Sequence, residues 1–575
     1  MKTNAEIADA LLRIADLLEI QGENVFRIRA YRNAARTVAE LPEGVASMIG
    51  RGEDLTELPG IGDDLAGKIT ELARTGHVPL LDRLARRLPG ELAEMMRLPG
   101  LGPKRVALVH ERLHIKTLAE LKAAAAAGRL HDVPGIGEKT EKTILAALER
   151  VDHKEKRTRL AFAEQIAEPL LVHLRSFKGV RDCIVAGSFR RRRETVGDLD
   201  ILVTCADGAK VVEHFVRYGD VRDVVSQGPT RSTVRLHSGM QVDVRVVPEE
   251  SYGAALLYFT GSKAHNIAVR KIAVAKKLKI NEYGVFKGPK HIAGRTEKDV
   301  YACVGLPYID PEIREDRGEI EAARKHRLPK LVTLDDIRGE MHAHTDATDG
   351  EDSLADMAAA ARERGYEYLA ITDHTKRLAM VHGQTARRLA SQIEKIEKLN
   401  AKMSGPRGFT LLKGAEVDIM DDGSLDLPDD ILKELDFTVC SIHYKFALSE
   451  EKQTERVLRA MDNRYFHIFG HPTGRLIGER DPYRIDIEKV LRGARERGCH
   501  MEVNAQPDRL DLNDVHCRLA KEIGVKVAIA TDAHRTTDLD KLRFGIDQAR
   551  RGWLEAGDVL NTRSVSALRK LLKRA

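Results

Sequence analysis

Seven short apolar runs after residue 335 each end in a side chain of a type that binds metals. The runs are GEMHAHTDATDG, YLAITDHT, LLKGAEVD, FTVCSIHY, HIFGHPT, HMEVNAQ and KVAIATDAH. Helical stretches such as SLADMAAAARERG and EEKQTERVLRAM lie between them. Strands that alternate with helices in this way build a parallel barrel, whose site lies at the carboxyl ends of the strands. We therefore expect a distorted (β/α)7 barrel over residues 336–575.

Nine residues at the ends of these runs are candidate metal ligands. They are His342, His344, Asp349, His374, Glu416, His443, His471, Asp532 and His534. A single histidine after a strand usually caps or packs, but nine side chains at equivalent positions predict one shared site. Imidazole and carboxylate ligands together favour zinc, manganese or iron over calcium.

The runs and their ligands resemble the PHP phosphoesterase domain, because each of the nine positions carries the residue type that this family uses. The resemblance implies a trinuclear centre with Zn²⁺ and/or Mn²⁺. It groups the ligands as His342, His344, Glu416 and Asp532 in one site, His443 and His471 with a bridging Glu416 in a second, and Asp349, His374 and His534 in a third.

An earlier stretch, GSFRRRRETVGDLDILV at residues 187–203, puts four arginines ahead of two aspartates. Because side chains alternate along a strand, Asp198 and Asp200 share one face while the apolar residues between them point to a core. A second strand, MQVDVRVV, carries Asp243 on its polar face. If the strands are neighbours, three carboxylates converge, which predicts a hard cation such as Mg²⁺ or Mn²⁺. Two such ions would stabilise the attacking and leaving oxygens of a phosphoryl transfer.

These motifs, with YFTGSKAHNIAVR and INEYGVF downstream, resemble the catalytic half of family X DNA polymerases over residues 1–316. The resemblance implies nucleotidyl transfer on gapped or nicked DNA from deoxynucleoside triphosphates. Asp198, Asp200 and Asp243 would then bind the metals, and Asp243 would accept the primer hydroxyl proton. The residues placed at the nucleotide are Gly187, Ser188, Arg191, Tyr258, Phe259, Gly261 and Asn266. Arg270 would contact the template, and Arg245 would pair with an active-site carboxylate.

Lys263 departs from the animal members of the family, which have an acidic residue after TGS. We hypothesise that Lys263 and the arginine run bind nucleotide partly without metal. The remaining arginines, Arg190, Arg192 and Arg193, either line the nucleotide entrance or form a solvated positive rim.

A short repeat marks the N-terminal region: LPGIGDDLAGKI at 58–69, LPGLGPKRVALV at 98–109 and VPGIGEKTEKTI at 133–144. Paired glycines allow a tight turn, and the amide groups that open the next helix can then hold a phosphate. The three copies resemble helix-hairpin-helix modules, which bind the DNA backbone without reading sequence. The candidate DNA contacts are Gly60, Gly62, Lys68, Gly100, Gly102, Gly135, Gly137 and Arg270.

Lys68 falls at the position of the Schiff-base lysine with which family members remove a deoxyribose phosphate. Asp64 and Phe26 stand where basic residues would help to bind the 5′ phosphate. Two interpretations therefore stay open for Lys68: a lyase nucleophile, or a contact to DNA phosphate.

The patterns predict a multidomain chain of six segments. Residues 1–85 and 86–160 form all-helical helix-hairpin-helix domains, 161–250 and 251–316 the α+β nucleotidyltransferase palm and the thumb, 317–335 a charged linker, and 336–575 the PHP barrel. A hinge at the linker, or release and rebinding, would carry a 3′ end between the two sites.

Composition agrees with this organisation. The 575 residues, 32% of them charged, are too many for one core, and the formal net charge of +6 permits a polyanionic partner. Six scattered cysteines without a CxxC pair fit a reducing cytoplasm. No stretch has the roughly 18 uninterrupted apolar residues of a membrane span. We expect a cytoplasmic monomer with no membrane partner.

The sequence thus predicts a family X polymerase that fills short gaps in DNA repair and processes 3′ ends with its PHP domain. Three activities stay open there: 3′-5′ exonuclease, removal of a blocking 3′ phosphate, and cleavage beside an abasic site. The alternatives are a barrel that is a small-molecule phosphatase or a structural remnant, and a non-catalytic DNA-binding scaffold.

Overall fold

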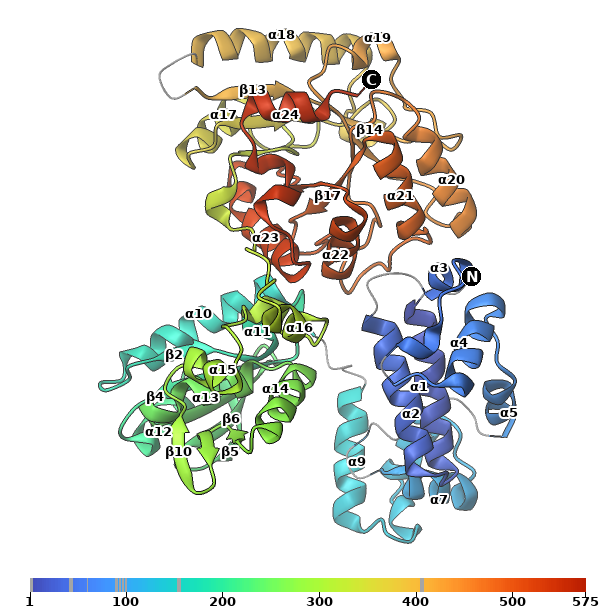
Figure 1. Ribbon diagram of the computed structural model, residues 1–575, viewed down its shortest axis with the longest axis vertical. Helices are drawn as coiled ribbons and strands as arrows, with labels where there is room; N and C mark the ends of the chain where they lie inside the picture. Colours follow the sequence, from blue (N-terminus) through green and yellow to red (C-terminus); the bar gives the residue numbers. More distant parts are fainter. Residues whose placement is uncertain are drawn as a thin grey trace. The chain divides into compact units, whose positions relative to one another are not determined.

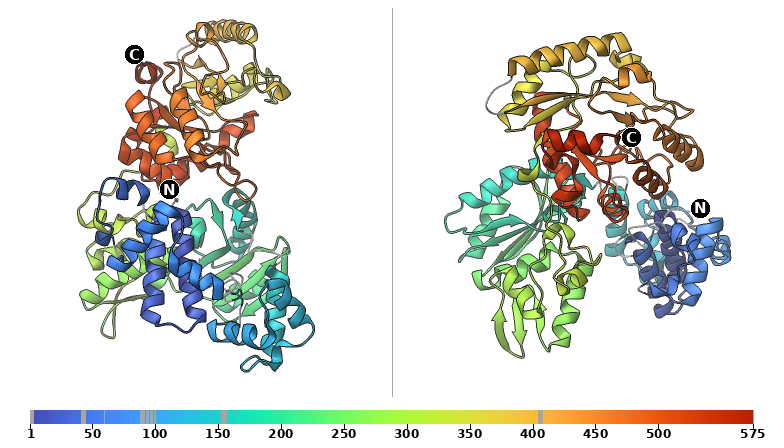
Figure 2. Two further views of the ribbon diagram at one scale, coloured as in Figure 1. Left: turned by 90° about the vertical axis from the view of Figure 1, so that its right-hand side faces the viewer. Right: turned by 45° about the horizontal axis from the view of Figure 1, so that its top comes forward.

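The computed structural model describes residues 4–574, apart from 41–44, 59, 88–91, 93–94, 96–97, 99–100, 152–156 and 404–407. The chain divides into two compact units, Met1–Lys156 and Arg157–Ala575. Figures 1 and 2 draw them from three directions.

The N-terminal unit is helical throughout its described part, which is blue to cyan in Figures 1 and 2. Its α-helices are α1 (Asn4–Ile20), α2 (Val25–Glu40), α3 (Val45–Gly50), α4 (Asp63–Thr75), α5 (Pro79–Arg87), α7 (Pro103–Leu113), α8 (Leu118–Ala126) and α9 (Glu138–Val151). Helix α1 buries Ile7, Leu11, Ile14 and Leu18, whose three- and four-residue spacing puts them on one face. This apolar stripe forms one core of the unit together with α2, α4 and α5, and α7, α8 and α9 contribute to a second.

The first part of the second unit is built on a five-stranded mixed sheet of order β2-β4-β7-β6-β5. Its strands are β2 (Cys183–Val185), β4 (Asp198–Thr204), β5 (Val221–Gln227), β6 (Arg231–Leu236) and β7 (Gln241–Val247). Only the β4–β7 pair is parallel. Helices α10 (Leu160–Ser176) and α12 (Gly208–Val216) pack on the face that carries Leu199, Ile201 and Val203. Helix α13 (Tyr252–Thr260) packs on the opposite face, which carries Asp198 and Asp200.

Three helices and a small antiparallel sheet follow. They are α13, α14 (Lys263–Ala275), α15 (Glu297–Val304), β8 (Lys279–Asn281), β9 (Gly284–Lys287) and β10 (Lys290–Ala293). The segment predicted as a charged linker contains a packed helix, α16 (Glu319–Arg324). Glu319 and Ala323 of this helix are fully buried, and the Glu319 carboxylate lies 2.6 Å from Nδ1 of His265 on α14. The start of this segment is therefore part of the folded unit.

The C-terminal part has short strands that pair only in parallel within its two sheets. The sheets have the orders β11-β12-β13 and β14-β15-β16-β17-β18. The strands are β11 (Gly339–Glu340), β12 (Tyr368–Ile371), β13 (Thr410–Lys413), β14 (Glu416–Asp418), β15 (Val439–Ser441), β16 (Ile468–Phe469), β17 (His500–Asn504) and β18 (Val527–Ala530). Isolated parallel bridges, His374 with Glu416 and Ala343 with Ala533, link the two sheets. The predicted alternation of strands and helices is confirmed, whereas closure into a barrel stays a prediction.

Helices α17 to α22 of this part lie between strands, as the apolar pattern predicted, whereas α23 and α24 follow the last strand, β18 (Figure 1). The α-helices are α17 (Leu354–Glu363), α18 (Ala386–Met403), α19 (Asp429–Leu432), α20 (Glu450–Ala460), α21 (Ile487–Arg497), α22 (Asp514–Ile523), α23 (Leu542–Arg551) and α24 (Val565–Leu572). The six cysteines are all free thiols. Across the described residues, no helix combines the length and the apolar character that crossing a bilayer requires.

Candidate functional sites

Two neighbouring strands bring the aspartates of the first site together. Strands β4 and β7 pair in parallel, with Asp200 directly opposite Asp243 and Asp198 opposite Gln241. The expectation that the two strands are neighbours is therefore confirmed. Because residues two apart share a strand face, all three carboxylates lie on the same side of the sheet.

The electrostatics of this site favour a cation. Burial and the charges of Asp198 and Asp243 together raise the pKa of Asp200 to about 7, against the opposing effect of Arg245. Gly187 packs so closely that a Cβ atom there would lie 2.5 Å from Oδ2 of Asp200. Carboxylates that raise one another's pKa in this way are stabilised by a bound divalent ion. The residues present thus fit the predicted Mg²⁺ or Mn²⁺.

Hydrogen bonds fix the orientation of Asp243. The Thr233 hydroxyl donates to Oδ1 over 2.5 Å, and the Gln241 side chain donates to Oδ2 over 3.0 Å. Arg245 was predicted to pair with a carboxylate, but its guanidinium lies 4.4 Å from the centre of the Phe259 ring. It acts on the aspartates through its charge, because it lowers the pKa of Asp200.

The predicted nucleotide contacts lie on a turn and two helices beside these strands. Gly187, Ser188 and Arg191 belong to or follow the short helix α11 (Gly187–Arg190). Tyr258 and Phe259 end α13 with their rings edge to face, 5.1 Å apart. A Cβ on Gly261 would lie 3.2 Å from Nη1 of Arg191, so the two predicted contacts are adjacent.

Helix α14 carries the other three residues predicted to face nucleotide or template. The Asn266 side chain donates to the Tyr258 carbonyl over 2.6 Å, and Arg270 lies 6.0 Å from the Tyr258 ring centre. Lys263 is the first residue of the helix and is exposed. Its ammonium group can therefore reach a ligand in solvent.

The interpretation as a solvated rim is wrong for Arg190 and Arg192, whereas a place at the nucleotide entrance stays a prediction. Their side chains are only 14% and 19% exposed. Arg190 forms two hydrogen bonds to Glu297, and Arg192 pairs with Glu164 at 2.6 Å. Neither forms a solvated rim, because each is held by a carboxylate.

The glycine repeats of the N-terminal unit open helices, as predicted. Gly60 and Gly135 have φ angles of 80° and 86°, which favour glycine. Gly62 and Gly102 are the N-cap residues of α4 and α7. Gly137 immediately precedes α9, whereas Gly100 lies outside the described residues.

Lys68 lies on α4, where its ammonium group pairs with Asp64 one turn earlier. It is also 6.0 Å from the centre of the Tyr31 ring. Phe26 is 78% exposed, at a position where a basic residue was expected for phosphate binding. Both interpretations of Lys68, a lyase nucleophile and a contact to DNA phosphate, stay predictions.

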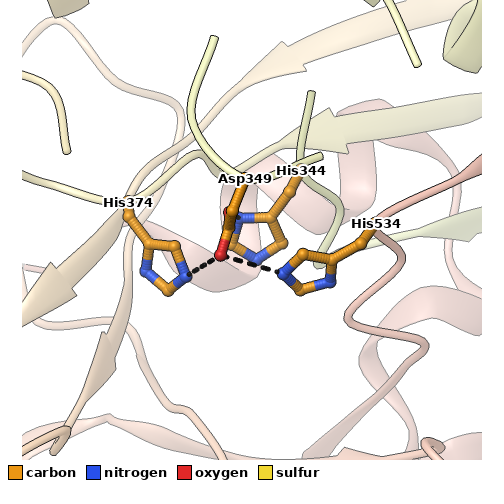
Figure 3. Close-up of side chains that lie close together, drawn as sticks. All are labelled: His344, Asp349, His374 and His534. Carbon is orange, nitrogen blue, oxygen red and sulfur yellow. Dashed lines mark ion pairs between the residues drawn. The ribbon is translucent and has the colours of Figure 1, made fainter. Parts of the chain in front are cut away.

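The second site gathers the predicted ligands of the C-terminal part at the ends of its strands. Three groups have ligand atoms within 4.8 Å of one another: His344, Asp349, His374 and His534; His342, His344 and Asp532; and His374, Glu416 and His443. Figure 3 shows the first group, in which the His374 and His534 rings both point at Asp349. Nε2 of each ring lies 3.3 Å from Oδ2 of Asp349.

Glu416 lies at the centre of this arrangement, as a bridging carboxylate would. Its Oε1 lies 2.9 Å from Nε2 of His471 and 3.2 Å from Nε2 of His443. Its Oε2 lies 2.9 Å from Nδ1 of His374 and 3.4 Å from Nε2 of His342. Glu416 thus connects the predicted first and second sites, and His471, which is in none of the three groups, approaches it from one side.

Two carboxylates that the sequence reasoning missed orient the histidines. Nδ1 of His342 lies 2.6 Å from Oε1 of Glu502, and Nδ1 of His443 lies 3.1 Å from Oδ1 of Asp418. Each contact leaves Nε2 facing Glu416. Carboxylates behind metal-binding histidines fix the ring and raise its basicity. The two-residue strand period could have found Asp418, since it shares a strand face with Glu416.

Unsatisfied polar atoms show that the site fits metal ions. Nε2 of His342, both ring nitrogens of His344, Oδ1 of Asp349 and Oε2 of Glu416 are buried without a hydrogen-bond partner. Buried polar groups normally have such partners, and a group that lacks one indicates an ion. Several of these atoms lie close to an opposite charge without hydrogen-bond geometry, as ligands that converge on an ion do.

The pKa shifts of the residues in this site also indicate that it attracts cations. Burial alone would lower the pKa of His443 and His534, but nearby carboxylates outweigh it and raise each pKa to about 9. Burial would raise the pKa of Glu416 and Asp532, but the surrounding histidines hold both well below the usual range. The carboxylates therefore stay charged and attract cations, which are protons or metal ions.

Five family models match consecutive parts of the chain. They are a helix-hairpin-helix domain at residues 2–78, a SAM-like helix-hairpin-helix tandem at 92–150, a DNA polymerase beta palm at 161–234, a DNA polymerase beta thumb at 255–315 and a PHP domain at 340–506. A relative from Bacillus subtilis (strain 168), named DNA polymerase/3′-5′ exonuclease PolX, is 37% identical over 99% of both chains. The chain belongs to the PolX family.

Other relatives match one end of this PolX-family chain. A probable phosphatase of Thermoanaerobacter sp. (strain X514) is 32% identical over 41% of this chain and 94% of its own length. DNA polymerase lambda of Rattus norvegicus is 27% identical over 54% of this chain and 56% of its own.

Proposed function

We propose that this protein is a family X DNA polymerase that fills short gaps in DNA repair and trims 3′ ends at its PHP site. The observation that carries the proposal is the presence of two separate ligand sets in one chain. One is the carboxylate triad on β4 and β7, and the other is the histidine and carboxylate cluster around Glu416. The relative that covers the whole chain is named for both activities.

At the polymerase site, Asp198, Asp200 and Asp243 would hold Mg²⁺ or Mn²⁺. Bound ions would supply Lewis-acid stabilisation of the phosphate oxygens. Asp243 is oriented by Thr233 and Gln241 and accepts the proton of the primer hydroxyl. This proton transfer makes the 3′ oxygen a better nucleophile.

The incoming nucleotide would lie between the α11 turn and the end of α13. Gly187, Ser188 and Arg191 hold the triphosphate, for which an arginine fork is well suited. Tyr258, Phe259, Gly261 and Asn266 contact the sugar and base, while Arg270 contacts the template. Lys263 is exposed at the start of α14 and adds a positive charge that attracts the triphosphate.

At the PHP site, the nine predicted ligands would hold a trinuclear centre of Zn²⁺ and/or Mn²⁺, and the strands around it form a distorted seven-stranded barrel. The bridges between the two sheets support this closure. Ions there would stabilise charge on a phosphate during hydrolysis. Glu502 and Asp418 keep the His342 and His443 rings in place. The favoured reaction is 3′-5′ exonuclease action, and removal of a 3′ phosphate or cleavage beside an abasic site would use the same groups.

The N-terminal unit would grip gapped or nicked DNA through its glycine turns. Amide groups at the starts of α4, α7 and α9 suit phosphate oxygens. Such contacts bind DNA without reading its sequence, as gap repair requires. We propose that the protein acts as a cytoplasmic monomer, and that Lys68 contacts DNA phosphate.

A second candidate function is supported by the phosphatase relative, which matches the C-terminal part over nearly its own full length. In this alternative the PHP site hydrolyses small phosphomonoesters and leaves DNA intact. The two candidates share the ligand set and differ only in substrate.

The proposal is tested with gapped DNA labelled at the primer 5′ end, in Mn²⁺. With nucleotides we expect extension by the gap length, and without them we expect shortening from the 3′ end. A protein that neither extends nor shortens the primer would contradict the proposal. Phosphate release from a small phosphomonoester, with the primer intact, would establish the second candidate.

A further inference from the structure

Three of the four arginines at residues 190–193 pair with carboxylates from distant parts of the chain. Arg190 pairs with Glu297 at the start of α15, and Arg191 pairs with Glu315 at 3.0 Å. Arg192 lies 2.6 Å from Asp547, which belongs to α23 in the PHP region. The run is therefore a junction where the nucleotide turn meets other segments, including a helix that follows it by about 350 residues in the sequence.

Helix α23 supplies a second contact at this junction. Nη1 of Arg551, the last residue of the helix, donates to the Arg191 carbonyl over 2.7 Å and to Glu315 over 3.1 Å. Its Nη2 donates to Asp514 over 2.7 Å. The Arg551 side chain is only 3% exposed. One buried guanidinium thus holds both the backbone of Arg191 and the carboxylate that pairs with the Arg191 side chain.

The packing around these contacts shows that α23 shares a buried apolar cluster with the polymerase region. Phe544 of α23 and Leu510 are buried in the same apolar cluster as Leu199 and Val242. A further pair joins Glu194 to Arg475 at 2.6 Å. Packing therefore fixes the position of α23, and with it the position of Arg551 beside Arg191.

Because Glu315 pairs with both Arg191 and Arg551, Arg551 lowers the free energy needed to release the Arg191 side chain from Glu315. If the Arg191 side chain turns towards a triphosphate, Glu315 still has Arg551 as a partner. Without Arg551, the same movement would leave a buried carboxylate unpaired, which is strongly unfavourable. Burial raises the pKa of Glu315, but the charges of Arg551 and Arg191 outweigh it and keep the carboxylate ionised. Arg551 therefore leaves Arg191 available to the nucleotide.

We propose that helix α23 of the PHP region sets the nucleotide affinity of the polymerase site, with Arg551 as the positioning residue for Arg191. Asp547 assists by holding the next arginine of the turn. The inference rests on the proposed role of Arg191 in binding triphosphate. It assigns the PHP region a function in nucleotide addition besides its own chemistry.

The test is steady-state gap filling by the full chain with Arg551→Ala. We expect the nucleotide KM to rise about tenfold while kcat changes less than about threefold, because ground-state contacts to the triphosphate are weakened. Primer shortening without nucleotide should stay unchanged. The matched control is Arg569→Ala, which removes an ion pair with Asp436 from a half-exposed arginine of the same region.

A second variant separates positioning from folding. Glu315→Gln added to Arg551→Ala removes the carboxylate that would otherwise hold Arg191, so the nucleotide KM should return to within about threefold of wild type. A KM unchanged by Arg551→Ala would overturn the proposal. Equal loss of extension and shortening without recovery in the double variant would also overturn it, since that pattern indicates damaged folding.

The Arg191→Ala variant distinguishes a failure of this inference from a failure of the proposed triphosphate contact on which the inference rests. We expect this variant to raise the nucleotide KM more than Arg551→Ala does. If Arg191→Ala leaves the KM unchanged, the assigned triphosphate contact is wrong and the inference falls with it. If Arg191→Ala raises the KM and Arg551→Ala does not, only the inference fails.

Discussion

The two ligand sites of this chain differ in how much of their charge the protein balances by itself. At the polymerase site, burial and the repulsion of neighbouring carboxylates raise the pKa of Asp200 to about 7. At the PHP site, acids alternate with histidines, and Glu416 is surrounded by imidazole rings. The PHP site therefore has its charged ligands in place before an ion binds. At the polymerase site, the negative charge is balanced only when metal and nucleotide bind together.

The difference follows from where each site lies. Asp198 is exposed at the start of β4, while His342, His344 and Glu416 are almost completely buried. A buried set must be satisfied within the protein, and its unpaired atoms indicate ions that remain bound between reactions. An open set can exchange its ions with each nucleotide. Each prediction below tests this contrast.

The largest expected effect is the separation of the two activities. Asp198→Ala should reduce primer extension at least about 10³-fold and leave shortening intact, because a metal ligand supplies several kcal/mol to the transition state. His344→Ala should do the reverse. Both variants are assayed on one gapped DNA. Loss of both activities from either change would mean that they share a site.

Metal removal should affect stability in the same asymmetric way. Chelator should lower the thermal unfolding temperature of the wild-type protein, since ions bound at 1,000 times their Kd contribute about 4 kcal/mol. Asp200→Asn should show the same shift, and His344→Ala should show little. Calorimetry with and without chelator measures this. A shift that is abolished by Asp200→Asn would contradict the contrast.

Much of both sites was predictable because strand periodicity is local. The alternation around Asp200 and Asp243 placed them on one face, and the strand ends located the candidate ligands that the structure brings together around Glu416. The partners of Arg191 and Arg192 were not predictable, since Arg551 and Asp547 reach them only through packing of distant segments. From the sequence, a run of like charges therefore predicted arginines exposed to solvent, whereas in the fold carboxylates from distant segments pair with them.

The orienting carboxylates should have intermediate effects. Glu502→Gln and Asp418→Asn keep the shape of the side chain but remove the charge behind His342 and His443. Primer shortening should fall about 10- to 100-fold, with extension unchanged. Asp436→Asn, on an ion pair with the half-exposed Arg569 away from both sites, is the matched control. Unchanged shortening in both variants would show that the rings need no such support.

The smallest expected effect concerns the polymerase site. Thr233→Val removes the hydroxyl that donates to Asp243 over 2.5 Å. The rate of gap filling should fall about three- to tenfold, because one hydrogen bond contributes about 1 kcal/mol. Primer shortening should be unaffected. Single-turnover extension at saturating nucleotide measures the step. A larger loss than in Asp198→Ala would contradict the assignment of the carboxylates as the principal ligands.

The metal content of the full-length protein after gel filtration without nucleotide tests the central contrast most directly. We predict that wild type and Asp200→Asn retain the same complement of transition ions, up to one for each of the three ligand groups at the PHP site. His344, which belongs to two of these groups, is the matched position there, and His344→Ala should lose most of the ions. Equal metal loss in Asp200→Asn, or a wild-type protein that retains no ion, would contradict the account.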